Sequence, residues 1–181
     1  MIFNVGLGVG ASQKKNRLFP GVHRDNLPKR PSLRVALLAG LGGFLGITAL
    51  DLFTRANATP WIVGSFGASC MVLFGMPETP FAQPRNVIVG HLIGSAVGLA
   101  FLLLLGDFWW GLPAAVWCAI SVMLLTRTVH PPAVSNPVIV FLAHPPAGML
   151  MLQTLVGAVI LVLLAYGYNN HIRRIHYPRY W

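Results

Sequence analysis

The side chains best suited to chemistry lie at two proline-rich breaks in an otherwise apolar chain. The first break, residues 77–86, holds guanidinium and carboxamide groups and is followed by a histidine, and the second break, which begins at Arg127, repeats this combination. Guanidinium groups select anions in membrane pores, and histidine changes its charge near physiological pH. We therefore predict a pathway for a small anion, lined by Gln83, Arg85, Asn86 and His91 at the first break and by Arg127, His130 and Asn136 at the second.

Each of these side chains also has a structural interpretation. A histidine within a membrane helix can form a hydrogen bond to a neighbouring helix, so His91 can serve packing instead of a pathway. An arginine at the membrane interface can extend to lipid headgroups, which is the alternative for Arg85 and Arg127. Glu78 is the acidic residue that could pair with either arginine.

Metal binding and catalysis are disfavoured by the sequence. His130 and His144 have no carboxylate or cysteine at ligand spacing, so we expect no metal site. The acidic residues Asp51, Glu78 and Asp107 stand far apart in the chain, and no nucleophile–base pair or glycine-rich phosphate loop is evident. We therefore expect that the protein is not an enzyme and that it uses no cofactor.

The breaks themselves follow from proline chemistry. His-Pro-Pro-Ala occurs twice, at residues 130–133 and 144–147. Proline lacks a backbone donor and disfavours helical geometry in the residue before it, so each copy should end a helix. Asn136 followed by Pro137 has the form of an N-cap and a first-turn proline. These signals predict a short half-helix over Pro137–His144, sheltered from lipid by the rest of the protein.

The composition is that of an integral membrane protein. Of the 181 residues, 55% are hydrophobic and only 9% are charged, against about 25% charged in an ordinary soluble domain. We predict an all-α fold with about five transmembrane helices plus the short re-entrant helix, and six spans as the alternative. The five predicted spans are Arg34–Phe53, Pro60–Met76, Val87–Gly106, Leu112–Thr126 and Met149–Tyr168.

The charge distribution predicts three regions and an orientation. Residues 1–33 form a basic cytoplasmic arm, residues 34–168 the transmembrane domain, and residues 169–181 a basic, aromatic tail. Basic segments beside a span mark the cytoplasmic side and contact anionic lipid headgroups, and six spans would put both basic ends there. Nucleic acid is disfavoured as a partner because the arm lacks interleaved stacking aromatics. The arm's basic residues include Lys14, Lys15, Arg17 and Arg24.

Small residues predict where helices meet. Gly90, Gly94 and Gly98 form one row on the third predicted span, and Gly42 and Gly46 form a shorter row on the first. Such rows allow close backbone approach. We expect these faces to be buried against another helix or against another subunit.

Three stretches resemble one known family. Residues 64–69, 73–91 and 126–133, with their strings Ala-Gln-Pro-Arg-Asn and Thr-Arg-Thr-Val-His-Pro-Pro-Ala, are similar to the HPP family of integral membrane proteins over Arg34–Tyr168. The resemblance implies a small multispan protein of transporter type, with plastid and cyanobacterial relatives linked to nitrite movement. It places the protein in the bacterial inner membrane, or alternatively in the plastid inner envelope.

Two functions are therefore predicted. The first is a transporter or channel for a compact inorganic anion such as nitrite. The second is a structural or accessory subunit of a larger membrane complex, in which the glycine faces and the basic, aromatic tail contact partner membrane subunits or further copies of the chain.

Overall fold

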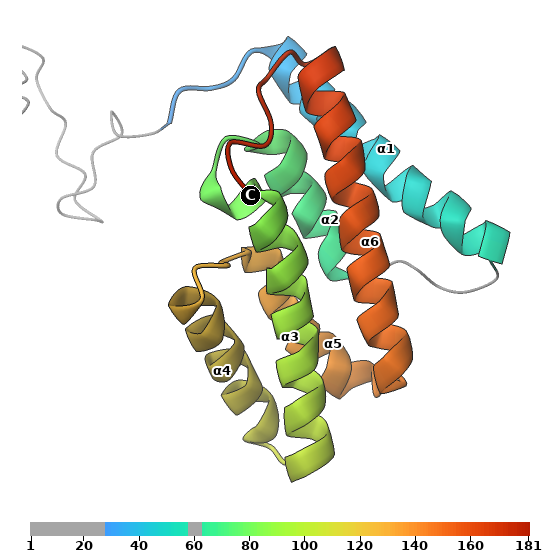
Figure 1. The fold of residues 1–181 in the computed structure, drawn as a ribbon, viewed down its shortest axis with the longest axis vertical. Helices are drawn as coiled ribbons and strands as arrows, with labels where there is room; N and C mark the ends of the chain where they lie inside the picture. Colours follow the sequence, from blue (N-terminus) through green and yellow to red (C-terminus); the bar gives the residue numbers. More distant parts are fainter. Residues whose placement is uncertain (1–27, 58–62) are drawn as a thin grey trace, which may run out of the picture. The chain divides into compact units, whose positions relative to one another are not determined.

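The computed structural model describes residues 28–57 and 63–181, and Leu33–Trp181 forms one compact unit. Every regular element in the described ranges is helical, which confirms the predicted all-α fold (Figure 1). Some sequence predictions lie outside the described residues, namely those on Lys14, Lys15, Arg17 and Arg24 of the arm and on the start of the second predicted span at Pro60.

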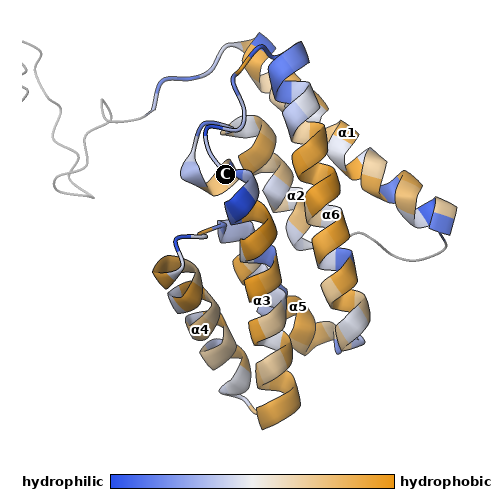
Figure 2. Ribbon diagram, viewed as in Figure 1, coloured by the Kyte–Doolittle hydropathy of each residue, from blue (hydrophilic) through white to orange (hydrophobic). Residues whose placement is uncertain are grey.

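Among the described residues, three helices are long and apolar enough to cross a membrane. They are α1 (Leu33–Asn57), α3 (Pro84–Leu105) and α6 (Ala147–Gly167), which continues through a π-helical turn, η5 (Tyr168–Ile172). They match the first, third and fifth predicted spans, and Figure 2 shows hydrophobic residues along their length. Large apolar side chains such as Leu103 and Leu104 remain exposed, as expected of a surface that faces lipid.

The remaining helices are shorter. They are α2 (Ser65–Cys70) with its π-helical continuation η2 (Met71–Gly75), α4 (Gly111–Leu125), and η4 (Pro131–Ser135) leading into α5 (Asn136–Ala143). A single 3₁₀ turn, η3 (Pro80–Ala82), lies between η2 and α3. At 1.5 Å per residue, the helix Ser65–Gly75 covers about 16 Å, roughly half of a hydrocarbon core.

The prediction of one continuous helix for the second span is wrong. The structure begins this helix at Ser65 and ends it at Gly75, so it is a half-helix instead of a continuous helix over Pro60–Met76. Val63 is buried although it is not helical. Hydropathy reports burial in an apolar environment and does not distinguish a helix from a non-helical apolar segment, which explains the error.

The predicted half-helix at the second break is confirmed, with one correction. Helix α5 ends before His144, whose φ of 46° places it in the left-handed region that terminates helices. Asn136 is the first helical residue and not the N-cap. Ser135 occupies the cap position, and its hydroxyl donates to the Pro132 carbonyl at 2.7 Å. The Asn136 side chain is therefore free to point away from its own helix.

Helix α3 lies at the centre of the unit, between α4 and α6 (Figure 1). Its glycine row faces the second break: a Cβ at Gly90 would lie 2.8 Å from His130 Cβ, and one at Gly98 would lie 2.8 Å from Pro137 Cα. A Cβ at Gly94 would overlap the Ala133 carbonyl oxygen. The close approach is thus made within one chain, because only glycine admits the backbone of residues 130–137 here.

The shorter glycine row, Gly42 and Gly46, forms the face through which α1 packs on its neighbour. A Cβ at Gly42 would lie 2.5 Å from Phe74 Cδ1, and one at Gly46 would lie 3.1 Å from Cys70 Sγ. Phe74 is fully buried. Helix α1 therefore packs onto the α2–η2 half-helix through its glycine face, with most of its other faces left exposed.

The first and last long helices meet at one end of the unit. The Tyr168 hydroxyl, at the end of α6, donates to the Leu38 carbonyl near the start of α1 at 2.7 Å. At the opposite end, His144 Nε2 lies 3.7 Å from Asp107 Oδ2, which brings the end of α5 to the loop between α3 and α4. The start of α1 and the end of α6 therefore share one end of the unit, the tail end.

Candidate functional site

The two proline breaks are joined to each other by side-chain hydrogen bonds. Arg85 Nη2 donates to the Thr126 carbonyl at 3.2 Å, and Asn86 Nδ2 donates to the Val129 carbonyl at 3.0 Å. Both donors stand in the first turn of α3, and both acceptors lie in the segment that follows α4. The structure thus brings together two predicted site residues of the first break with the backbone of the second.

The segment after α4 begins with a tight helix termination. The Thr128 amide donates to the Met123 carbonyl at 2.9 Å and the Arg127 amide donates to the Leu124 carbonyl at 3.2 Å, a Schellman pattern. Arg127 occupies the left-handed position of this motif, with φ of 56°. Glycine is the usual residue there because a Cβ is strained in that conformation. The Arg127 side chain is exposed, as is Arg85 beside it.

Below these arginines lies a fully buried polar cluster. His91 on α3 and His130 at the second break each have 0% exposure, and their ring centroids are 4.9 Å apart. The hydroxyl of Ser69 on α2 lies between them, 2.8 Å from His91 Nε2 and 2.9 Å from His130 Nε2. The other ring nitrogen of His130, Nδ1, lies 2.7 Å from the Phe81 carbonyl of the first break. One hydroxyl thus links the two predicted histidines.

Asn136 extends the cluster towards α6. Its Nδ2 donates to the His91 carbonyl at 3.2 Å and to Ser95 Oγ at 2.8 Å, and it lies 3.3 Å from His91 Nδ1. Ser95 in turn lies 3.0 Å from Thr154 Oγ1 of α6. Residues of α2, α3, α5 and α6 therefore meet in one polar core.

Sequence reasoning missed the serines of this core. Ser69 and Ser65 stand four residues apart on α2, and Ser65 Oγ lies 3.5 Å from His91 Nδ1. Their spacing puts both on one helix face, inside the stretch 64–69 that carries the family resemblance. The four-residue spacing of these serines was the signal available in the sequence. A serine in a membrane helix commonly bonds to its own backbone, however, and the Ser65 carbonyl lies within reach of Ser69 Oγ at 3.2 Å.

Two buried acceptors in this region have no partner among the described residues. They are Asn86 Oδ1 and Asn136 Oδ1. Each amide is oriented by a backbone carbonyl that accepts from its Nδ2, so the two oxygens cannot exchange places with the nitrogens without losing that bond. Buried acceptors are nearly always satisfied in folded proteins, so these two oxygens are suited to a hydrogen-bond donor from outside the chain.

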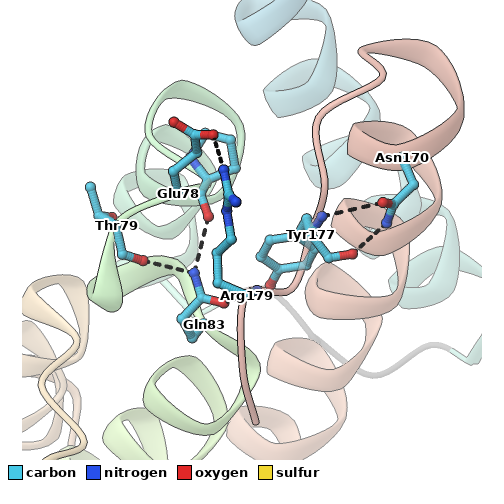
Figure 3. A network of polar contacts seen from close by, with 7 residues as sticks. Glu78, Thr79, Gln83, Asn170, Tyr177 and Arg179 are labelled. Carbon is cyan, nitrogen blue, oxygen red and sulfur yellow. Dashed lines mark hydrogen bonds and ion pairs between the residues drawn. The ribbon is translucent and has the colours of Figure 1, made fainter.

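Gln83, a predicted pathway residue, takes part in a network of polar contacts between the first break and the tail (Figure 3). Its Nε2 donates to the Pro77 carbonyl at 3.1 Å and to the Thr79 carbonyl at 2.9 Å, and its Oε1 accepts from the Arg179 amide at 2.7 Å. Both groups of this carboxamide are thus engaged in holding the first break to the tail. Its place in a pathway remains a prediction.

The tail forms a strap, residues 173–181, over the first break. The Tyr177 hydroxyl donates to the Ala82 carbonyl at 2.8 Å, and the Tyr177 side chain is only 1% exposed. Arg179 pairs with Glu78, so the acidic residue expected for Arg85 or Arg127 is taken by the strap (Figure 3). Asn170 holds the Tyr177 backbone from both sides. Burial raises the pKa of the Tyr177 phenol.

A cavity of about 330 Å³ opens beside the strap. It is lined by residues from the end of η2, the first break and the tail, namely Gly75, Met76, Pro77, Glu78, Thr79, Arg173 and Ile175. Neither histidine lines it. In this structure the histidine cluster is therefore closed, and the first break is open to the surroundings.

Acidic groups and metal ligands are dispersed among the described residues. Asp51 pairs with Arg55 at 2.7 Å, while Glu78 and Asp107 lie at the strap and at the opposite end. Within residues 28–57 and 63–181, no three histidine, cysteine or carboxylate groups lie close enough to hold a metal ion. The chemistry available at the buried cluster is hydrogen bonding and proton exchange.

Long apolar helices, half-helices and a polar core sealed between them define an integral membrane protein. A family model described as HPP, transmembrane region, matches residues 28–178, and the chain belongs to this family, as the resemblance implied. Two relatives from Dictyostelium discoideum, both named only as transmembrane proteins, are 32% and 29% identical over 173 and 171 residues.

These alignments cover 89% and 87% of the chain but 61% and 54% of the relatives. The chain thus spans somewhat more than half the length of the proteins it matches. No solved structure matches the chain.

Proposed function

We propose that this protein is a transporter or channel for a compact inorganic anion, nitrite being the substrate that the family resemblance favours. The observation that carries the proposal is the meeting of two broken membrane segments around His91 and His130, with Arg85 and Arg127 exposed beside them. Broken helices at membrane depth are a common way for transporters to build a binding site. Exposed guanidinium groups at an entrance attract anions and repel cations.

We propose further that both basic ends of the transmembrane region lie on the cytoplasmic side. The proximity of the start of α1 and the end of α6 at the tail end supports an even number of passages and favours the six-span alternative over five. The basic residues Arg173, Arg174 and Arg179 follow α6 at that end. Cytoplasmic basic residues are the general rule for membrane proteins, and they would contact anionic headgroups.

The bacterial inner membrane is the location we propose, with the plastid inner envelope as the alternative. In either membrane, the exposed apolar faces of α1 and α4 would contact lipid or further copies of the chain. Enzymatic activity is not part of the proposal, because Asp51, Glu78 and Asp107 are separated and each lies beside a basic group or histidine.

A structural or accessory subunit is the second candidate. One observation favours it: His91, His130 and Asn136 are fully buried and bonded within the chain, as groups that only hold helices together would be. The strap argues against the tail as a contact surface for partner subunits. Tyr177 and Arg179 already form hydrogen bonds to the first break of the same chain (Figure 3).

Flux measurements separate the two candidates. The purified protein is inserted into liposomes, and nitrite entry is followed at neutral pH against empty liposomes, where little nitrous acid is present to cross unaided. We expect nitrite flux above the empty-liposome rate, reduced when Arg127 is replaced by glutamine. Absence of flux for nitrite and for other small anions, together with co-purification of a stoichiometric partner subunit, would support the accessory role instead.

A further inference from the structure

The side chain of His130 is surrounded by electrically neutral groups. Its polar neighbours from α2, α3, α5 and the first break are hydroxyls, a carboxamide, a second imidazole and a backbone carbonyl, namely Ser65, Ser69, His91, Asn136 and Phe81. The ring of Phe66 packs edge-on against His91, with centroids 5.1 Å apart. No ionic partner for either imidazole is found among the described residues.

Other charged or titratable groups on the surrounding elements point elsewhere. Helices α2, α5 and α6 carry no acidic residue, lysine or arginine within their bounds. Arg85 on α3 and Arg127 after α4 are exposed, and Glu78 of the first break pairs with Arg179. The remaining titratable side chains near the cluster lie towards α1 or at partly exposed positions, namely Cys70 on α2, Tyr168 on α6 and Cys118 on α4.

Hydrogen-bond direction fixes where the protons are when the cluster is neutral. The Phe81 carbonyl can only accept, so His130 Nδ1 carries a hydrogen and its Nε2 is an acceptor. The Ser69 hydroxyl then donates to His130 Nε2 and accepts from His91 Nε2. His91 Nδ1 is left as the acceptor for the Ser65 hydroxyl, with Asn136 Nδ2 also 3.3 Å away. Every ring nitrogen has a suitable partner in this state.

The same atoms also satisfy a protonated His130. If Nε2 gains a proton, it donates to Ser69 Oγ, and the Ser69 hydrogen turns to the Ser65 carbonyl, which lies 3.2 Å away. Ser69 Oγ can accept from both histidines because a hydroxyl oxygen has two lone pairs. His130 Nδ1 keeps its bond to Phe81. One hydroxyl rotation therefore changes the cluster between a neutral and a protonated form with no hydrogen bond of His130 lost.

We propose that His130 takes up the proton that accompanies each transported anion, so that the two cross together without net charge. This inference rests on the proposed anion transport. Burying a lone imidazolium or a lone anion in this neutral, water-excluded cluster would carry a large desolvation penalty, whereas the attraction within an adjacent pair offsets much of it. His130 gains its proton from water on one side of the membrane and returns it to water on the other.

The unpartnered oxygens give independent support. Asn86 Oδ1 and Asn136 Oδ1 are buried acceptors, and a bare anion beside a carbonyl oxygen is repelled. A proton that passes from His130 to the oxyanion, or a water that moves with the pair, supplies the donor that these oxygens lack. The cluster is therefore suited to an anion that arrives with a proton and is poorly suited to an anion alone.

The decisive measurement uses the unmodified protein. Liposomes containing the protein and a trapped pH dye are given a nitrite gradient at equal pH on both sides, with potassium and valinomycin setting the membrane potential. We expect one proton to enter per nitrite above the empty-liposome rate, and nitrite flux to be independent of the imposed potential. Nitrite flux that follows the potential without proton entry would overturn the inference and leave anion transport intact, whereas absence of any anion flux would overturn both.

Variants locate the proton site. His130→Asn keeps a side-chain donor for the Phe81 carbonyl but cannot take up a proton, so we expect proton entry to be lost while the protein still purifies as the wild type does. His144→Asn is the matched control in the second His-Pro-Pro-Ala copy, where the side chain is exposed, and it should leave both fluxes unchanged. Proton entry that survives in a folded His130→Asn protein contradicts the assignment.

Discussion

Asn86 donates from its side-chain amide to the Val129 carbonyl, 3.0 Å away, and so joins the first turn of α3 to the second proline break. The two residues are 43 positions apart in the chain. Proline breaks leave backbone carbonyls without helical partners, and in a membrane such groups must be satisfied by the protein itself. The polar residues of the first break therefore have a structural task as well as any role in a pathway.

Replacing Asn86 by leucine should destabilise the fold. The variant keeps the side-chain volume but leaves the Val129 carbonyl without this donor, which costs about 1–2 kcal/mol of unfolding free energy. Thermal unfolding in one detergent, followed by tryptophan fluorescence, measures the change. Asn57→Leu is the control, because its similar bond to the Phe53 carbonyl is exposed and its loss should change stability little. Equal effects of the two variants would contradict the bridging role.

Gly94→Ala should be the more disruptive change at the helix interface. The new Cβ would overlap the Ala133 carbonyl oxygen, so α3 and the second break must separate, at a cost of about 1–3 kcal/mol. The thermal midpoint of the purified variant checks this. Gly40→Ala on α1, where no atom lies within 4 Å of the new Cβ, should leave stability unchanged or raise it slightly. A neutral Gly94→Ala variant would mean that the two segments are not in contact.

The sequence identified much of this site because polar residues in an apolar chain are conspicuous. The positions of His91, His130 and Asn136 near proline breaks predict that they share a site, and the structure places them in one cluster. Glycine spacing predicted close packing but could not name the partner, since spacing describes only one of the two surfaces. The structure shows that the surface packed against Gly94 is the second break.

Two features could not be read from the sequence for physical reasons. The helix at Ser65 starts late because apolar character does not specify backbone conformation. The strap was missed because basic and aromatic residues suit lipid headgroups, partner proteins and the chain's own surface equally well. Only the three-dimensional structure shows that Tyr177 and Arg179 contact the first break (Figure 3).

Tyr177→Phe should weaken the attachment of the strap. The Ala82 carbonyl loses its buried donor, which lowers the unfolding free energy by about 1–2 kcal/mol. Limited proteolysis of the tail, together with the thermal midpoint, reports the loss. Tyr180→Phe, at a residue 46% exposed, is the matched control and should behave as the wild type does. Unchanged proteolysis in Tyr177→Phe would show that this bond does not hold the strap.

The strap should also make stability sensitive to alkaline pH. Burial raises the pKa of Tyr177 in the folded protein above its ordinary value of about 10. The neutral phenol therefore makes its full contribution to the unfolding free energy below pH of about 10. This contribution is lost as the pH rises further, because the unfolded chain releases the phenol proton more readily than the folded protein does. We expect the thermal midpoint to fall less steeply above pH of about 10 in Tyr177→Phe than in the wild type. Parallel curves for the two proteins would contradict this expectation.

Arg127 and Arg174 provide a test that separates backbone strain from charge. Both are exposed arginines in the left-handed region, with φ of 56° and 57°. Such a conformation costs a residue with a Cβ about 1 kcal/mol or more relative to glycine. The charge of Arg174 has no place in the proposed anion pathway, whereas Arg127 lies where we place the anion entrance.

Arg127→Gly should therefore stabilise the protein and impair its transport. Relief of strain raises the unfolding free energy by up to about 1 kcal/mol, while loss of the guanidinium weakens the apparent affinity for nitrite about fivefold or more, equivalent to about 1 kcal/mol of attraction. Arg174→Gly should gain similar stability with unchanged nitrite flux. Arg127→Asn, which tolerates the left-handed conformation but lacks the charge, should repeat the transport defect. If all three variants transport nitrite as the wild type does, Arg127 does not attract the anion and serves only to end α4.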